Sequence, residues 1–415
     1  MKAAQIHWAS VAQFGLSTLV IINLWTGALT LIFVGLTDRF YQASAPINGP
    51  LPILMMATVA FICGVLLLPS AYYALWRLLG WHPLDAFPML KRLHPALWIF
   101  AFPILLFLGN WVSSYPSLSS WILPVLSLLV IGLPIIWILY LAVRGLPLGS
   151  PQRTWGLFGS GLILAPALIM IAEAVAGLVF LGLIVYNFLN HPDQLRELSK
   201  LAFWMRNSNP SLEAILQKIS PYLLMPSVIF LVLTFSAVVV PVIEELLKPI
   251  GVWLLAGRKL PPAAGFVAGA ISGAAYAFIE SLVLTTNDQQ WASMMFARVG
   301  TSVVHIFTSA LTGWAIVQIW GRKRYKTFFL STFAAVCIHG LWNALIVAAS
   351  FTTLASQQGL SLRIPGLSHF TQIAPLGLLF LTIGVFTLLV YSNRSLHRTS
   401  RLAEIDRPRE NPIED

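Results

Sequence analysis

Long apolar runs recur along this chain and restrict what it can fold into. Several are 18 residues or longer, which is the length of a helix that crosses a lipid bilayer. Only 10% of the 415 residues are charged and 58% are hydrophobic, whereas about a quarter of an average soluble domain is charged. The sequence therefore predicts an all-α protein, a polytopic bundle of transmembrane helices.

The predicted spans number ten and cover residues 12–36, 51–76, 95–113, 121–143, 156–189, 222–256, 262–285, 291–320, 327–350 and 371–392. Lys and Arg gather in alternate connections, as at 322–326, while the intervening connections at 110–120 and 287–290 contain neither. Because positively charged loops stay on the cytoplasmic side, both termini are expected in the cytoplasm, with the spans in a bacterial cell membrane. The net charge of +10 then belongs mostly to span ends and does not indicate a nucleic-acid partner.

The connection at 191–221 is positively charged although it falls on the outer side. Apolar residues repeat in it at helical spacing, which favours an amphipathic helix lying on the outer surface: Leu195, Leu198, Leu201, Ala202 and Met205. Asn209-Pro210 is the expected start of a second short helix. The predicted organisation is five N-terminal spans whose role stays open (1–190), this extracytoplasmic segment (191–221), a catalytic membrane bundle (222–350), a loop and last span (351–392) and a cytoplasmic polar tail (393–415).

Five charged side chains and two histidines interrupt the apolar runs of the second half, namely Glu244, Glu245, Lys248, Glu280, Arg298, His305 and His339. Each costs roughly 2.5–3.5 kcal/mol at the centre of a membrane helix, so such groups are expected to meet one another or water. The helical rise places four of them roughly 20–30 Å above the cytoplasmic loops. The sequence therefore predicts that they line one intramembrane site.

Carboxylates, imidazoles and an amide in a dry cavity suit the activation of water. A buried carboxylate is a competent general base, and imidazole or amide donors, as on His339 and Asn343, can hold an oxyanion. A Glu and His set can also bind Zn²⁺ and leave one position for water. The residues that could serve as metal ligands are Glu245, Glu280, His305 and His339. HExxH and G-x-S-x-G are absent from the sequence, so a glutamic and a zinc mechanism both stay open.

Four short motifs occur in order on consecutive predicted spans. They are E-E-x-x-K at Glu244–Lys248, aromatic-x-x-x-E at Tyr276–Glu280, R-x6-H-x7-G at Arg298–Gly313 and H-x-x-W-N at His339–Asn343. In these residues the chain resembles the PrsW-type intramembrane proteases, of the wider CAAX-protease and bacteriocin-processing superfamily, over about residues 222–350. The resemblance implies an endopeptidase that cuts single-span, membrane-anchored proteins such as anti-sigma factors near the outer face.

The resemblance also implies roles for individual residues. Glu244 and Glu245 would activate water together with Glu280 and His305, while His339 and Asn343 would polarise the scissile carbonyl. The supporting residues would be Lys248, Tyr276 and Arg298. The chain departs from the family pattern at Tyr276, where Phe is usual, and at Ser281, where Asn is common. The five N-terminal spans have no counterpart in the small family members.

Two other classes of protein fit the same residues. A transporter or proton-coupled channel could use the acids and histidines as a relay, and a non-catalytic membrane scaffold could keep the fold without turnover. Single residues also have simpler interpretations. Glu244 and Lys248 could form a structural ion pair, Glu280 could be a hydrated acid at the membrane interface, and Arg298 could be a counter-ion. Glu173, in an earlier span, is expected to bond a neighbouring helix and is left out of the site.

Overall fold

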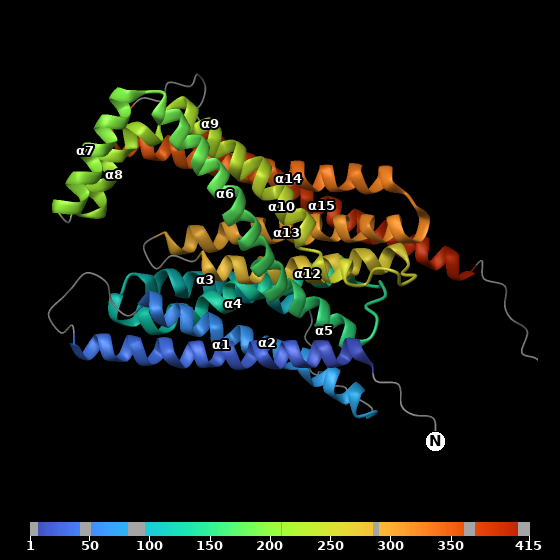
Figure 1. Ribbon diagram of the computed structural model, residues 1–415. Helices are drawn as coiled ribbons and strands as arrows, with labels where there is room; N and C mark the ends of the chain where they lie inside the picture. The colour runs from blue at the N-terminus through green and yellow to red at the C-terminus, as the bar shows by residue number, and fades with distance from the viewer. Residues whose placement is uncertain are drawn as a thin grey trace, which may run out of the picture. The chain divides into compact units, whose positions relative to one another are not determined.

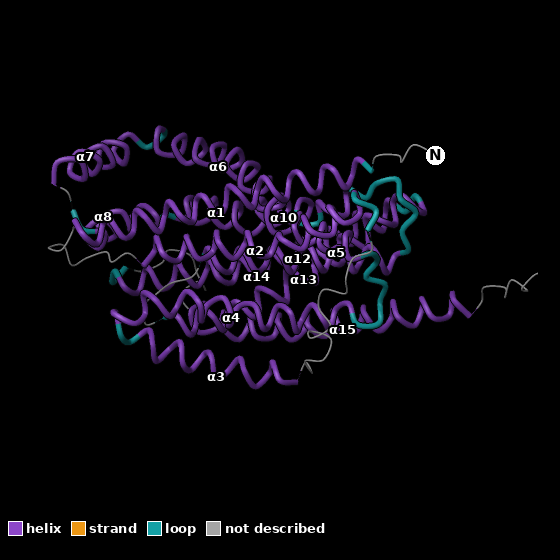
Figure 2. The backbone as a smooth tube through the Cα atoms, turned by 90° about the horizontal axis from the view of Figure 1, so that it is seen from below, coloured by secondary structure: helices purple, strands orange, loops and turns teal. Residues whose placement is uncertain are grey.

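The computed structural model describes residues 7–41, 51–81, 96–208, 210–284, 290–360 and 370–405. Within these ranges the chain is helical with short turns and contains no strand (Figure 2). Nine helical segments of this described part are long and apolar enough to cross a membrane. The all-α, multi-pass architecture predicted from the apolar runs is therefore confirmed.

Two predicted spans differ from the structure. The span at 95–113 is helix α3 (Ala96–Ser113), whose apolar stretch Phe100–Ser113 is shorter than the nine. The span expected over 222–256 is not one helix, because the segment Pro226–Leu247 ends before Lys248 and Pro249, which form a turn. Proline lacks an N–H and disfavours helical backbone in the residue before it, so the break falls where the sequence places Pro249.

The chain forms two compact units that alternate along the sequence. The first comprises Met1–Pro166, Lys248–Ser331 and Val385–Asp415, and the second comprises Ala167–Leu247 and Thr332–Gly384. The chain passes from unit 1 to unit 2 within α6 (Ala165–Leu189) and within α14 (Tyr325–Gln357). It returns to unit 1 between Leu247 and Lys248 and within α15 (Phe370–Ile405). The division into an N-terminal region and a catalytic bundle stays a prediction.

Unit 1 is built around α12 (Pro262–Val283) and α13 (Trp291–Arg322), which run side by side (Figure 1). Glycines on α12 allow the two backbones to touch: a Cβ added at Gly269 would lie 2.1 Å from the carbonyl oxygen of Ser309, and one at Gly273 would lie 2.6 Å from that of His305. The small-residue stripe therefore acts in helix packing, as the sequence predicts. This close approach brings the polar faces of α12 and α13 together.

The N-terminal region comprises α1 (Trp8–Tyr41), α2 (Leu51–Leu78), α3, α4 (Pro116–Val143), α5 (Pro151–Gly159) and the π-helical η1 (Ser160–Leu164). Four of these N-terminal helices, namely α2, α4, α5 and η1, pack on α12. At Gly161 an added Cβ would lie 2.4 Å from the Ser272 carbonyl. A polar cluster ties α1, α2 and α5, in which Gln13 donates to Ser70 Oγ (3.1 Å) and to the Gln152 carbonyl (3.1 Å). Much of this region thus serves to position α12.

Unit 2 contains α6 (Ala165–Leu189), α7 (Pro192–Ser208), α8 (Leu212–Leu223), α9 (Pro226–Thr234), the π-helical η2 (Phe235–Val239), α10 (Val240–Leu247) and most of α14. Helix α7 confirms the helix expected from the leucine spacing, and its place on the outer membrane surface stays a prediction. The second helix begins later than Asn209-Pro210, at Leu212, because Ser211 caps it by accepting from the Ala214 N–H. Residue 209 lies outside the described residues.

Candidate functional site

The predicted site residues fall into two buried groups, one in each compact unit. The unit 2 half-site contains Glu244 and Glu245 on α10 with His339 and Asn343 on α14. The unit 1 half-site contains Lys248, which follows α10, with Tyr276 and Glu280 on α12 and Arg298 and His305 on α13.

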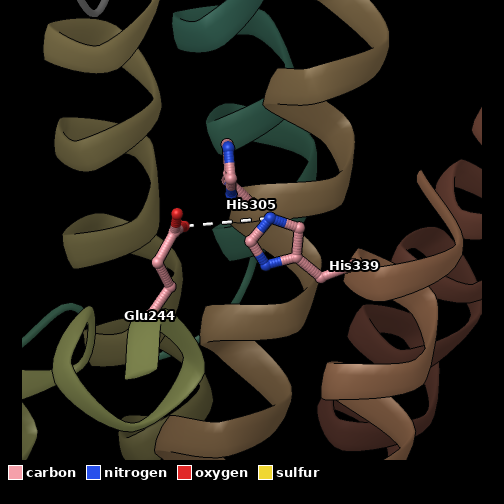
Figure 3. A group of neighbouring side chains, drawn as sticks. All are labelled: Glu244, His305 and His339. Carbon is pink, nitrogen blue, oxygen red and sulfur yellow. Dashed lines mark ion pairs between the residues drawn. The ribbon is translucent and has the colours of Figure 1, made fainter. Parts of the chain in front are cut away.

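In the unit 2 half-site the His339 ring lies between two carboxylates. Its Nδ1 lies 2.9 Å from Oε1 of Glu245, a hydrogen bond, and its Nε2 lies 3.8 Å from Oε2 of Glu244 (Figure 3). All three side chains are buried, and Glu245 is 0% exposed. An ionised carboxylate only accepts, so the Nδ1–H of His339 donates to Glu245, and the Nε2 lone pair of the neutral imidazole is directed toward Glu244.

A π-turn sets the direction of α10. In η2 the backbone bonds run from residue i to i+5, and the Val240 N–H donates to the Phe235 carbonyl. The same register pairs the Ser236 carbonyl with residue 241, which is a proline and has no N–H to give. Asn343 supplies the missing donor, because its Nδ2 donates to the Ser236 carbonyl at 2.9 Å.

The carbonyl that needs a partner is thus Ser236, one residue before Ala237, the position that an α-helical count gives. Gly340 on α14 explains how the helices come so close: a Cβ added there would lie 2.2 Å from the Ala237 carbonyl oxygen. Asn343 therefore braces α14 against η2, and this contact holds His339 opposite the two acids of α10.

The unit 1 half-site is a row of charged and imidazole groups. Lys248 Nζ lies 2.8 Å from Nδ1 of His305, and Nε2 of His305 lies 2.5 Å from Oε2 of Glu280. Arg298 Nη1 lies 3.5 Å from the other carboxylate oxygen of Glu280. The Tyr276 ring packs edge-to-face with His305, with centroids 5.4 Å apart. Lys248 is not on the helical face of Glu244, as a continuous helix would place it, because α10 ends at Leu247.

No sequence motif indicated two features of the site. The Ser272 hydroxyl donates to the Lys248 carbonyl at 2.5 Å and fixes the turn after α10. Its position was readable, since Ser272 lies four and eight residues before Tyr276 and Glu280 and so shares their face of α12. The Ser236 carbonyl could not be found this way, because a backbone group leaves no mark in the sequence.

The two half-sites carry opposite charge and are close along the chain. Unit 2 contributes the two carboxylates of α10, whereas unit 1 contributes the cations Lys248 and Arg298 with the single carboxylate of Glu280. Lys248 lies three positions after Glu245, and a chain of this length spans at most about 11 Å even when fully extended.

Residues 211–367 match the family described as PrsW family intramembrane metalloprotease. The matched segment is less than half of the chain, and it contains every residue of both half-sites. No curated protein and no solved structure matches the chain. The family match supports a protease of the membrane, in agreement with the nine long apolar helices of the described part.

Proposed function

We propose that this chain is an intramembrane endopeptidase that hydrolyses a peptide bond of a membrane-anchored, single-span protein. The observation that carries the proposal is the burial of matched Glu and His side chains within apolar helices. Glu245 with His339 and Glu280 with His305 form two carboxylate–imidazole pairs, at 2.9 Å and 2.5 Å. Such pairs can move a proton to and from a bound water or leaving amine, which peptide hydrolysis requires.

The donor set fits the metal that the family description implies. Glu244 Oε2 and His339 Nε2 are 3.8 Å apart, too far for a direct hydrogen bond. The separation suits two ligands of one Zn²⁺, since bonds to His nitrogen and carboxylate oxygen are about 2.0–2.2 Å long. Glu245 on the other nitrogen of His339 is the usual carboxylate partner of a metal-bound histidine.

Glu244 and His339 would therefore contribute two of the ligands of the metal. Zn²⁺ bound there would polarise the scissile carbonyl and lower the pKa of a water. Glu245 orients His339 and does not itself bind the ion. Glu280 lies beside His305 and Arg298 and is the carboxylate that accepts the proton of the attacking water. Asn343 acts by bracing η2.

The substrate follows from the membrane setting. We propose a single-span protein of the anti-sigma-factor kind, cut toward the outer side of a bacterial cell membrane, with both enzyme termini in the cytoplasm. The basic connections at 258–259 and 322–326, opposite loops without Lys or Arg, support this orientation.

Cleavage of a tethered single-span peptide in reconstituted vesicles tests the function. Glu280→Gln and Glu245→Gln should each lower the cleavage rate by roughly 100-fold or more, as expected for loss of a general base or of the group that positions the site. The matched control is Glu173→Gln, an acid in an apolar helix outside both half-sites, which should cleave like the parent. Full cleavage by Glu280→Gln would refute the assignment. Proton flux across the vesicles without cleavage would favour the relay function.

A further inference from the structure

Lys248 is a fully buried lysine that the reaction proposed above does not use. It is 0% exposed and among the largest fully buried side chains in the described part of the chain. The turn between α10 and α11 (Ile250–Trp253) presents it, and Ser272 fixes that turn by donating to its carbonyl. A buried lysine needs a partner for its charge, so its contacts indicate what it does.

The contacts of Lys248 are those of an ammonium ion. Its Nζ lies 5.2 Å from the centroid of the Tyr276 ring, over the ring, where the face of an aromatic attracts a cation. It also lies 2.8 Å from Nδ1 of His305, within hydrogen-bond distance. An ammonium has three donors and no acceptor, so this bond requires the lone pair of Nδ1.

That bond determines where the proton of a neutral His305 lies. With Nδ1 accepting, the proton must be on Nε2, the nitrogen 2.5 Å from Oε2 of Glu280. A carboxylate oxygen only accepts, so the position of Glu280 is compatible with a proton on Nε2. Arg298 contacts the other oxygen of the same carboxylate at 3.5 Å. Lys248 thus donates to Nδ1 of His305, and the Nε2–H of His305 faces the carboxylate of Glu280.

We propose that Lys248 is a positioning residue that fixes His305 as the Nε2–H tautomer and commits this ring to Glu280. A neutral imidazole that accepts at Nδ1 and carries its proton on Nε2 has no lone pair left for a metal. Resting on the proposed function, the inference assigns the metal to the Glu244 and His339 side of the site and the proton-handling carboxylate to the His305 side. His305 then belongs to the second group.

The tautomer can be read directly by nitrogen NMR of the full chain, labelled with ¹⁵N-histidine and reconstituted in lipid near neutral pH. The chain has eight histidines, so the signal missing from His305→Gln identifies the ring. The parent should show Nε2 protonated and Nδ1 unprotonated. Lys248→Arg, which keeps a donor, should retain this pattern, and Lys248→Met, which keeps only the apolar stem, should lose it. A parent ring protonated on Nδ1, or an unchanged pattern in Lys248→Met, would overturn the proposal.

Zinc titration of the same preparations tests the second consequence without any cleavage assay. His339→Gln should abolish binding, while His305→Gln should change the affinity by less than the roughly 10-fold that loss of even an outer partner costs. Loss of zinc from His305→Gln would make His305 a ligand and refute this assignment. Should Lys248→Met fail to fold, the parent tautomer alone still decides. Absence of proteolysis with the Nε2–H tautomer present would count against the protease and not against the role of Lys248.

Discussion

The packing of α12 on α13 leads to a prediction that can be worked out from distances. Replacing Gly269 by alanine adds a Cβ whose nearest neighbour is the backbone oxygen of Ser309 at 2.1 Å, and ordinary contact begins at 3.4 Å, so the helices must separate by 1.3 Å. The nearest atoms are backbone atoms of Ser309 and Ala310, so no flexible side chain can move aside to make room for the added Cβ. Overpacking of this kind costs about 1–3 kcal/mol, against about 0.5–1 kcal/mol gained from replacing a helical glycine.

The same displacement reaches the site. The contact between His305 on α13 and Glu280 on α12 is 2.5 Å, and 1.3 Å of separation would take it out of hydrogen-bond range. A misplacement of about 1 Å can cost roughly 100-fold in rate. Gly269→Ala should therefore fold, melt at a lower temperature and cleave a tethered substrate at least 10-fold more slowly.

Gly321→Ala is the matched control, since Gly321 lies on α13, the neighbour of α12, and an added Cβ meets nothing within 4 Å. The melting temperature of this variant in detergent should equal that of the parent or be slightly higher. Its cleavage rate in vesicles should equal that of the parent. Equal rates for the two alanine variants, in protein that is folded by circular dichroism, would show that the glycine contact does not position the site.

Three further predictions concern the unit 2 half-site. Asn343→Ala should lower the free energy of unfolding by about 1–3 kcal/mol, measured by chemical denaturation, because the Ser236 carbonyl loses its donor; rescue by Asn343→Asp, which cannot donate, would contradict this. Glu245→Gln should weaken zinc binding roughly 10- to 100-fold in a metal titration, since it orients His339, and unchanged affinity would remove Glu245 from that role. A strong chelator should abolish cleavage and lower the melting temperature, and added Zn²⁺ should restore both; full activity at zero metal content would favour the glutamic mechanism.

The sequence was a good guide wherever composition or helical spacing decides the outcome. Apolar runs located the long helices because backbone in lipid must bond to itself. The grouping of Glu280 with His305, and of Glu245 with His339, agrees with the idea that isolated charges in apolar helices seek each other. Ionisable residues at similar counts along neighbouring helices predicted one shared site, which stays a prediction, and did not name these two pairs.

The sequence was a poor guide where a single backbone bond decides. An α-turn and a π-turn have the same composition. An α-helical count from Pro241 therefore points to the Ala237 carbonyl, whereas the carbonyl that needs a side-chain donor is that of Ser236. Proline within an apolar run either kinks a helix or ends it, and at Pro249 it ends α10. The count of helical rise from Arg258 up to Glu244 fails for this reason, while the counts along α12, α13 and α14 run through unbroken helix.

The five residues of η2 also determine which way the acids of α10 point. Each residue of an α-helix turns the chain by 100°, so one residue too many or too few ahead of α10 would rotate Glu244 and Glu245 by about a quarter of a circle. The spacing between Pro226 and Glu244 is therefore as much a part of the chemistry as the carboxylates themselves. An insertion or deletion in this stretch would point the carboxylates of Glu244 and Glu245 in the wrong direction, even with every polar residue of the site still present.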